Sequence, residues 1–149
     1  MDNKARRGLI GAGFHWAEKQ SSPGPAFIEV YPHVAIIELF SYPCRFPYKV
    51  QKRGRYWPRL SADERLRKIG ENFFELRSKL ANDICNIDEF LPPLDPAVKY
   101  PLKFLKNHED IIAALICGLV GHFFLKGEAL PFGDDRGVIW VPSRRGPNE

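Results

Sequence analysis

The sequence predicts an α/β fold with a small sheet, and three observations lead to this class. Two short runs of β-branched and aromatic residues, at 26–31 and 138–142, have the composition of buried strands. The first run passes directly into an apolar helical segment, and two longer segments with helical periodicity separate it from the second run. With 149 residues, 44% of them hydrophobic, the chain is expected to form one domain over residues 1–149. Helices are expected near residues 33–40, 61–84 and 108–126.

The N-terminal third contains a weak helix, a strand and a short helix, in that order. Apolar residues have near-helical spacing within residues 5–18, but three glycines in the same stretch reduce its helix propensity. The strand AFIEVY at 26–31 ends at Pro32. Because the fixed φ of proline suits the first position of a helix, Pro32 is also expected to begin the helix at 33–40.

A basic loop over residues 43–60 and a long helix form the middle of the chain. The loop has six Lys or Arg residues and no acidic one, and its prolines discourage regular structure. Ser61 and Glu64 have the spacing of a capping box, and apolar residues then recur every three or four positions up to Ile84. These features predict a helix over residues 61–84.

The last helix is expected to be the central element of the core. Asn107 can cap it, Glu109 and Asp110 would lie in its first turn, and the segment that follows is apolar on nearly every side. Its most hydrophobic part, residues 111–125, is too short to span a bilayer, and the first residues have no signal-peptide character. Three cysteines without a CxxC pair indicate neither a disulfide framework nor a zinc site, so a cytoplasmic location is expected.

Two strands are too few for an independent sheet in water. The runs at 26–31 and 138–142 therefore either pair with each other beneath the helices or pair with strands from a second copy or another chain. The partners expected on this basis are a homo-oligomer or a second polypeptide that completes the sheet. No membrane partner is expected.

Two groups of acidic residues are candidates for chemistry. Glu29 lies in the middle of an otherwise apolar strand, where a carboxylate needs an ionic partner or a metal ion unless strand alternation turns it toward solvent. Glu109 and Asp110 follow His108 at the expected start of the last helix, where acids also occur simply because they complement the helix dipole. Each pattern alone fits a structural role, and the second pattern fits it better.

The basic loop is the candidate nucleic-acid interface. Tyr48, Tyr56 and Trp57 are interleaved with its cations, which suits contacts to a phosphate backbone together with base stacking. The residues expected to serve this role are Lys49, Lys52, Arg53, Arg55, Tyr56 and Trp57. The alternative is a solvated loop whose aromatic residues pack on the core. The net charge of +4 permits a polyanionic partner without demanding one.

Several motifs, taken in order, resemble the uncharacterised family of predicted RNase H-fold nucleases, distant relatives of the Holliday-junction resolvases. From about Gly8 to Pro142, the motifs are GAGF, FIEVYPH, FPYK, HEDIIAALICG, GEAL and GVIWVP. The resemblance implies an incomplete RNase H-like fold, of which this chain is the C-terminal portion. The first strands of the family have no counterpart before Met1, so we expect either a truncated copy or a remnant completed by another polypeptide.

The same resemblance implies phosphodiester hydrolysis with magnesium or manganese, by a two-metal scheme. By position, Glu29 matches the acid on a middle strand, Asp110 matches the first aspartate of the helix motif, and Glu109 lies beside it. These three are the expected catalytic residues, and Glu29 and Asp110 are the expected metal ligands. The family's second helix aspartate is replaced by Ala113, which cannot bind metal.

Two functions follow from these features. The first is a metal-dependent, nuclease-like protein of RNase H type that acts on nucleic acid but is degenerate or incomplete, so that hydrolysis by the isolated chain is not expected. The second is a non-catalytic protein that binds nucleic acid through the basic loop or assembles with a partner through an open sheet edge. The sequence leaves open whether the chain is an enzyme, which substrate it takes, and its oligomeric state.

Overall fold

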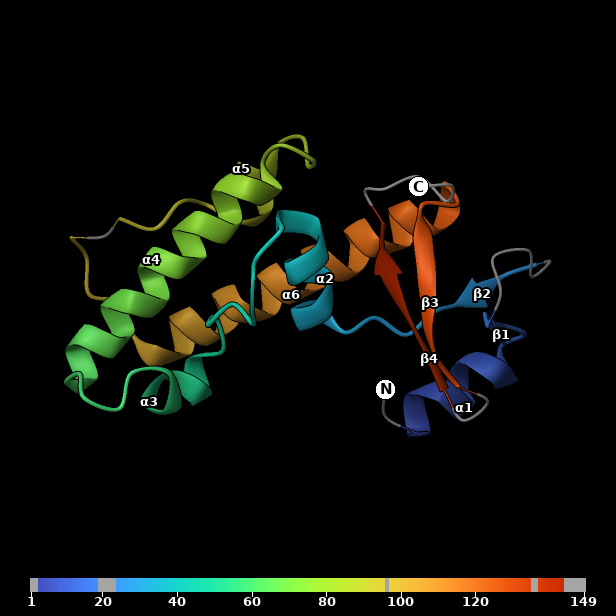
Figure 1. Ribbon diagram of the computed structural model, residues 1–149, viewed down its shortest axis with the longest axis horizontal. Coiled ribbons are helices and arrows are strands. Elements are labelled where there is room, and N and C mark those ends of the chain that lie inside the picture. The colour runs from blue at the N-terminus through green and yellow to red at the C-terminus, as the bar shows by residue number, and fades with distance from the viewer. Residues whose placement is uncertain (1–2, 19–23, 96, 135–136, 144–149) are drawn as a thin grey trace. The chain divides into compact units, whose positions relative to one another are not determined.

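The computed structural model has the expected α/β composition, and the structure describes residues 3–18, 24–95, 97–134 and 137–143 (Figure 1). The chain divides into two compact units. One comprises Met1–Pro43 and Cys117–Glu149, and the other comprises Cys44–Ile116. The mixed α/β class is therefore confirmed, whereas the single domain expected from chain length stays a prediction.

The sheet of the first unit is a β-hairpin. β3 (Ala129–Asp134) pairs antiparallel with β4 (Gly137–Pro142), and this confirms the strand predicted at 138–142. The pairing partner β3 was not predicted, because its sequence ALPFGD contains proline, glycine and aspartate, all of which are depleted in strands. A second, smaller pair joins β1 (His15–Trp16) in parallel to β2 (Ala26–Phe27).

The strand predicted at 26–31 is shorter than expected. Only Ala26–Phe27 form a strand, while Val30 makes an isolated parallel bridge to Trp140. The backbone N–H of Trp140 donates to the carbonyl of Glu29 at 2.8 Å. The two predicted strands thus do pair with each other, but through a single bridge, because α2 (Pro32–Phe40) begins two residues after Val30. The helix over 33–40 is confirmed in α2, with proline in its first turn.

Trp140 is the centre of the core of the first unit. Its side chain is 1% exposed, and Phe124 lies edge-on to it with ring centroids 4.6 Å apart. Its indole Nε1–H donates to the carbonyl of Ala17 at 2.8 Å, so this large ring is buried without an unsatisfied polar atom. The buried residues Ala35, Ile36 and Leu39 of α2 complete this core beside β4.

The weak helix expected over residues 5–18 is real but ends early. α1 (Asn3–Gly11) stops at its second glycine, and the chain reverses through Gly13, which has a positive φ of 85°. Because glycine adopts this conformation at little cost, the segment after it is free to extend as β1.

The second unit contains the helix that the sequence identified best. α4 (Ala62–Leu80) begins with the expected capping box: Ser61 N–H donates to Glu64 Oε2 at 2.8 Å, and Glu64 N–H donates to Ser61 Oγ. Hydrogen bonding from Ser61 lowers the pKa of the Glu64 carboxyl. The helix ends four residues before Ile84, in a stretch with turn-forming Asn and Asp, and the short α5 (Ile87–Phe90) follows.

The last helix begins earlier than predicted. α6 (Leu102–Leu125) has 24 residues, and the N–H of Leu105 donates to the carbonyl of Pro101 at its start. Proline restricts the chain to geometry that suits a helix start, so Pro101 rather than Asn107 precedes the first turn. Glu109 and Asp110 consequently lie in the interior of the helix, and the dipole no longer accounts for them.

The length of α6 also changes the membrane argument. By length and composition alone it could cross a membrane, with a mean hydropathy of 1.5 over an 18-residue window of which 33% is buried. The sequence argument considered only residues 111–125, and the helix that contains them is longer than that stretch. The indication is weak, because a core helix of a soluble protein has the same length and composition.

Residues 43–60 are less irregular than expected. They contain a 3₁₀ turn, η1 (Val50–Lys52), and one helical turn, α3 (Arg53–Tyr56). The prolines that argued for a loop stand at 43, 47 and 58, outside these turns, so they do not oppose them. We call residues 43–60 the basic segment from here on.

Candidate nucleic-acid interface

The basic segment enters the second unit as an extended stretch with one face in the core. Phe46, Tyr48 and Val50 are 7%, 0% and 1% exposed, whereas the residues between them are more accessible. This alternation has the period of two that extended backbone imposes on side chains. For Tyr48 the alternative reading was right, since its ring packs into the core and is not a stacking surface.

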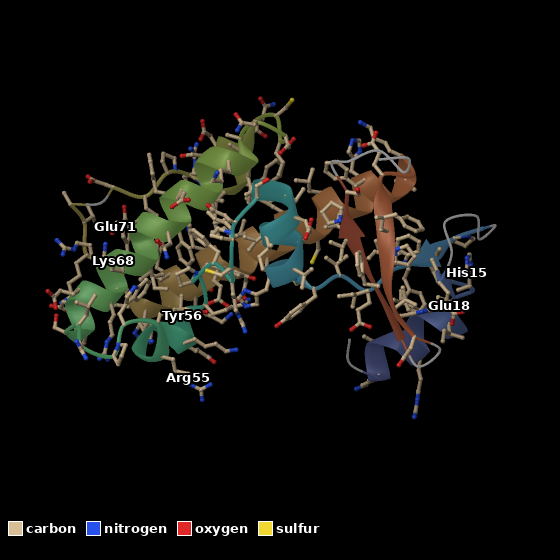
Figure 2. The ribbon with its side chains drawn as sticks, viewed as in Figure 1. His15, Glu18, Arg55, Tyr56, Lys68 and Glu71 are labelled. Atoms are coloured by element: carbon tan, nitrogen blue, oxygen red, sulfur yellow. The ribbon has the colours of Figure 1, made fainter. Side chains whose placement is uncertain are left out.

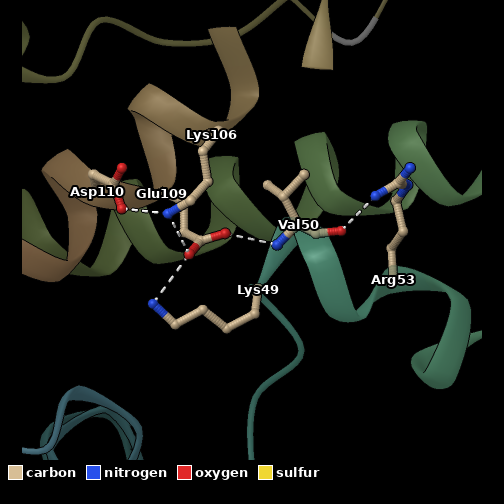
Figure 3. A network of polar contacts seen from close by, with 6 residues as sticks. All are labelled: Lys49, Val50, Arg53, Lys106, Glu109 and Asp110. Atoms are coloured by element: carbon tan, nitrogen blue, oxygen red, sulfur yellow. Dashed lines mark hydrogen bonds and ion pairs between the residues drawn. The ribbon is translucent and has the colours of Figure 1, made fainter. Parts of the chain in front are cut away.

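Glu109 holds the segment against α6. Its side chain is 4% exposed, and each of its oxygens accepts hydrogen bonds. The backbone N–H of Val50 donates to Oε2 at 2.7 Å, while the ammonium groups of Lys49 and Lys106 lie 3.1 Å from Oε1 (Figure 3). A buried carboxylate is costly unless it is paired and hydrogen-bonded, and here a backbone donor and two cations meet that condition.

Asp110 belongs to the same network but at its edge. Its carboxylate is 62% exposed and lies 2.5 Å from the Lys106 ammonium. The hydrogen bond to Asp110, followed by that to Glu109, raises the pKa of Lys106 despite partial burial. Lys106 therefore stays charged at neutral pH and keeps both carboxylates engaged.

Two side chains of α4 fix the segment at other points. The Asn72 side-chain amide donates to the carbonyl of Pro47 at 2.7 Å. The Arg65 guanidinium donates to the carbonyls of Trp57 at 2.9 Å and Pro58 at 2.8 Å. With Glu109 in the middle, the basic segment is anchored near its start, centre and end, and it presents its remaining side chains from an ordered backbone.

The residues expected to bind nucleic acid differ in accessibility. Arg55 is exposed and projects outward from α3, whereas Tyr56 lies toward the body of the unit (Figure 2). Lys52, Tyr56 and Trp57 are half-buried, and the two aromatic rings meet edge to face with centroids 5.6 Å apart. Lys49 is tied to Glu109, which reduces its value as a phosphate ligand.

Arginines dominate the accessible charge of the segment. Arg53 is half-buried and donates through Nη1 to the carbonyl of Val50 at 2.8 Å, an interaction that orients its guanidinium. Arg45 and Arg59 are exposed, and the expected set omitted both of them. The sequence could have indicated both, because they belong to the same run of cations without an acid. Neither of them, however, has an accessible aromatic residue next to it in the sequence.

Two of the three expected catalytic carboxylates, Glu109 and Asp110, are paired with lysines. Glu109 lies between the ammonium groups of Lys49 and Lys106, and Asp110 pairs with Lys106. A divalent cation would have to displace these lysines to bind the two carboxylates. Within the part of the chain that the structure describes, no three His, Cys, Asp or Glu side chains gather to hold a metal ion. Glu29 is half-buried in the first unit and Asp110 belongs to the second, so their convergence stays a prediction.

His108 is a buried structural histidine. It is 4% exposed, and its ring stacks on Phe73 and Phe104 with centroid distances of 6.0 and 5.4 Å. Its Nε2 lies 3.2 Å from the carbonyl of Pro92, which can only accept, so Nε2 carries the proton. Burial lowers the pKa of His108, and the ring is neutral at pH 7.

The buried ring of His108 is expected to make stability depend on pH. Its pKa is lower in the folded chain than in the unfolded chain, so the unfolded state binds more protons as the pH falls through about 6.5. The free energy of unfolding should therefore fall on acidification from about pH 8 to pH 5. Urea denaturation over this range measures it, with His108→Phe as a variant that keeps the ring stacking. Parallel pH profiles for the two proteins would show that His108 is not responsible.

Residues 8–137 match the model of a family described as protein of unknown function (DUF429). No curated protein and no solved structure matches the chain.

Proposed function

We propose that this chain, which belongs to the DUF429 family, binds nucleic acid and has a nuclease-like fold of RNase H type. In this proposal the basic segment contacts the phosphate backbone, and the chain in the form of this sequence does not hydrolyse its ligand. The protein acts in the cytoplasm, where nucleic acid is accessible.

The observation that carries the proposal is the anchoring of the basic segment. The segment has six cations and no acid, and Glu109 neutralises one of the six, Lys49. Glu109, Asn72 and Arg65 all accept from or donate to the backbone of the segment, which is more order than a loop that only solvates its charges requires. A preordered array of cations loses little conformational entropy when it meets a row of phosphates, and this favours binding.

The expected lack of hydrolysis rests on the acids. Ala113 stands where the resembled family has an aspartate, and Glu109 is committed to lysines and to a backbone N–H. Glu109 and Asp110, paired with lysines as they are, do not fit magnesium or manganese. Ligation of a metal by Glu29 and Asp110, with Glu109 as a further catalytic acid, remains a prediction of the resemblance.

The test is binding to labelled single-stranded and duplex oligonucleotides at several salt concentrations. If three to five cations contact phosphates, the logarithm of the affinity for duplex should fall with the logarithm of salt at a slope of about −3 to −4.5. Measurement in EDTA and in Mn²⁺ separates binding from hydrolysis. Absence of affinity at low salt would contradict the binding role, and shortened oligonucleotide in Mn²⁺ would contradict the lack of hydrolysis.

A second candidate is assembly with a partner through the first unit. Among the described strands β3 lies at the edge of its sheet, and all of its residues except Ala129 are exposed. Leu130 is 41% and Phe132 55% exposed, and an apolar edge strand of this kind is a template for another strand. A homo-oligomer or a second chain that completes the sheet is the function that remains if nucleic acid does not bind.

A further inference from the structure

The second unit contains a pocket that shares no residue with the basic segment. Its volume is about 450 Å³, within the range of small-molecule sites. α4 forms one wall, and the connector that leads to α6 forms the other. The lining residues that matter here are Leu66, Gly70 and Phe74 from α4, with Leu94, Val98 and Tyr100 from the connector.

The pocket is open at the position of Gly70. A Cβ added to this glycine would meet no atom within 4 Å, although the residue lies inside a 19-residue helix. Glycine is a poor helix former, and its missing side chain leaves the wall of the pocket hollow. The Cβ of a larger residue would contact no neighbour, and its side chain would occupy part of the pocket.

The interior of the pocket is apolar and its mouth is not covered. Leu94 is 6% exposed in its depth, whereas Phe74 and Val98 are each 50% exposed. Because water is in contact with this apolar surface, binding of an apolar molecule that displaces the water is favourable in free energy.

The charged side chains that line the pocket have partners: the Asp95 carboxylate accepts from the N–H of Ala97 at 2.8 Å, and Arg67 lies 3.9 Å from the Glu71 carboxylate. The Lys99 ammonium lies 2.8 Å from Asp63, and the Lys68 ammonium lies 2.9 Å from Glu71, beside it on α4 (Figure 2). Since these carboxylates already have partners, the pocket does not select a charged ligand.

Tyr100 supplies one polar group. Its hydroxyl oxygen accepts a hydrogen bond from the N–H of Asp95 at 2.9 Å. Within the described residues this is the one hydrogen bond of that hydroxyl, so its proton remains for an acceptor on another molecule.

We propose that this pocket binds a small neutral molecule with an apolar body and a hydrogen-bond acceptor, such as a carbonyl group. The apolar body lies against Leu66, Phe74 and Leu94, in the space left by Gly70. Tyr100 donates to the acceptor. The site is independent of nucleic-acid binding and remains in place if that role is wrong.

The experiment is a fluorescence titration of the whole chain with Nile red, which is neutral, flat and carries a carbonyl group. Saturable binding with a stoichiometry of one is expected. Gly70→Leu should weaken it by at least about tenfold while raising the Tm by about 2 to 4 °C, because a helix-interior glycine is replaced. Tyr100→Phe should weaken it by about three- to tenfold, the effect of losing one hydrogen bond.

The matched control is Ser78→Leu, which adds the same side chain to an exposed position of α4 outside the pocket. It should leave the affinity for Nile red unchanged. Equal affinity in the wild type and Gly70→Leu would overturn the proposal, as would binding that does not saturate. Self-association that buries the pocket, and that Gly70→Leu abolishes in sedimentation velocity, would make a second copy the occupant and would also overturn it.

Discussion

Replacement of Glu109 by alanine is expected to lower the free energy of unfolding by about 3 kcal/mol. The substitution leaves the Val50 N–H without its acceptor and removes the counter-charge of Lys49 and Lys106 in a place where the carboxylate was almost fully buried. Both lysines are partly exposed, which keeps the loss below that of a fully buried pair. Urea denaturation at neutral pH measures the change.

Asp110→Ala is the matched control for this prediction. It removes the neighbouring carboxylate of the same helix and the same Lys106 partner, but Asp110 is 62% exposed. An exposed pair one turn apart contributes about 0.3 to 0.5 kcal/mol, so the control should be nearly neutral. Similar losses in the two variants would show that Glu109 does not anchor the segment.

The sign of the effect also distinguishes an anchor from a catalytic acid. Carboxylates that gather to hold a metal repel one another when the metal is absent, so removal of one of them tends to leave stability unchanged or to raise it. An anchoring carboxylate has the opposite effect. A Glu109→Ala protein as stable as the wild type would therefore contradict the anchoring role and favour the catalytic role that the motif resemblance implies.

The elements that local sequence determines were predicted well. The capping box of Ser61 and Glu64 and the apolar periodicity after it define α4, and the run at 138–142 defines β4. Both signals depend on neighbours within one or two turns of chain. The predicted start of α6 was wrong for two reasons. Asn107 is a residue type that often caps helices, and Pro101, six residues earlier, was assigned to a connector.

The candidate site could be predicted only in part, because its decisive interactions join distant residues. Val50 and Glu109 are 59 positions apart, and Asn72 reaches Pro47 over 25 positions. No spacing rule connects such pairs. The density of cations in the basic segment was visible in the sequence, but which of them a buried carboxylate would neutralise was not.

Neutralising two cations of the basic segment should reduce nucleic-acid binding far more than neutralising two others of the same unit. In Arg55→Gln with Arg59→Gln, two exposed side chains lose their phosphate contacts, so the magnitude of the salt slope should decrease by about 1.8 and the affinity at low salt should fall about 10- to 100-fold. Arg67→Gln with Lys103→Gln removes the same charge from exposed positions outside the segment and should change the affinity by about twofold or less. Both double variants have the same net charge, so long-range attraction by the whole protein affects them equally. Equal losses in affinity and slope would mean that the segment is not the interface, whereas a loss confined to the first variant would place the phosphates on it.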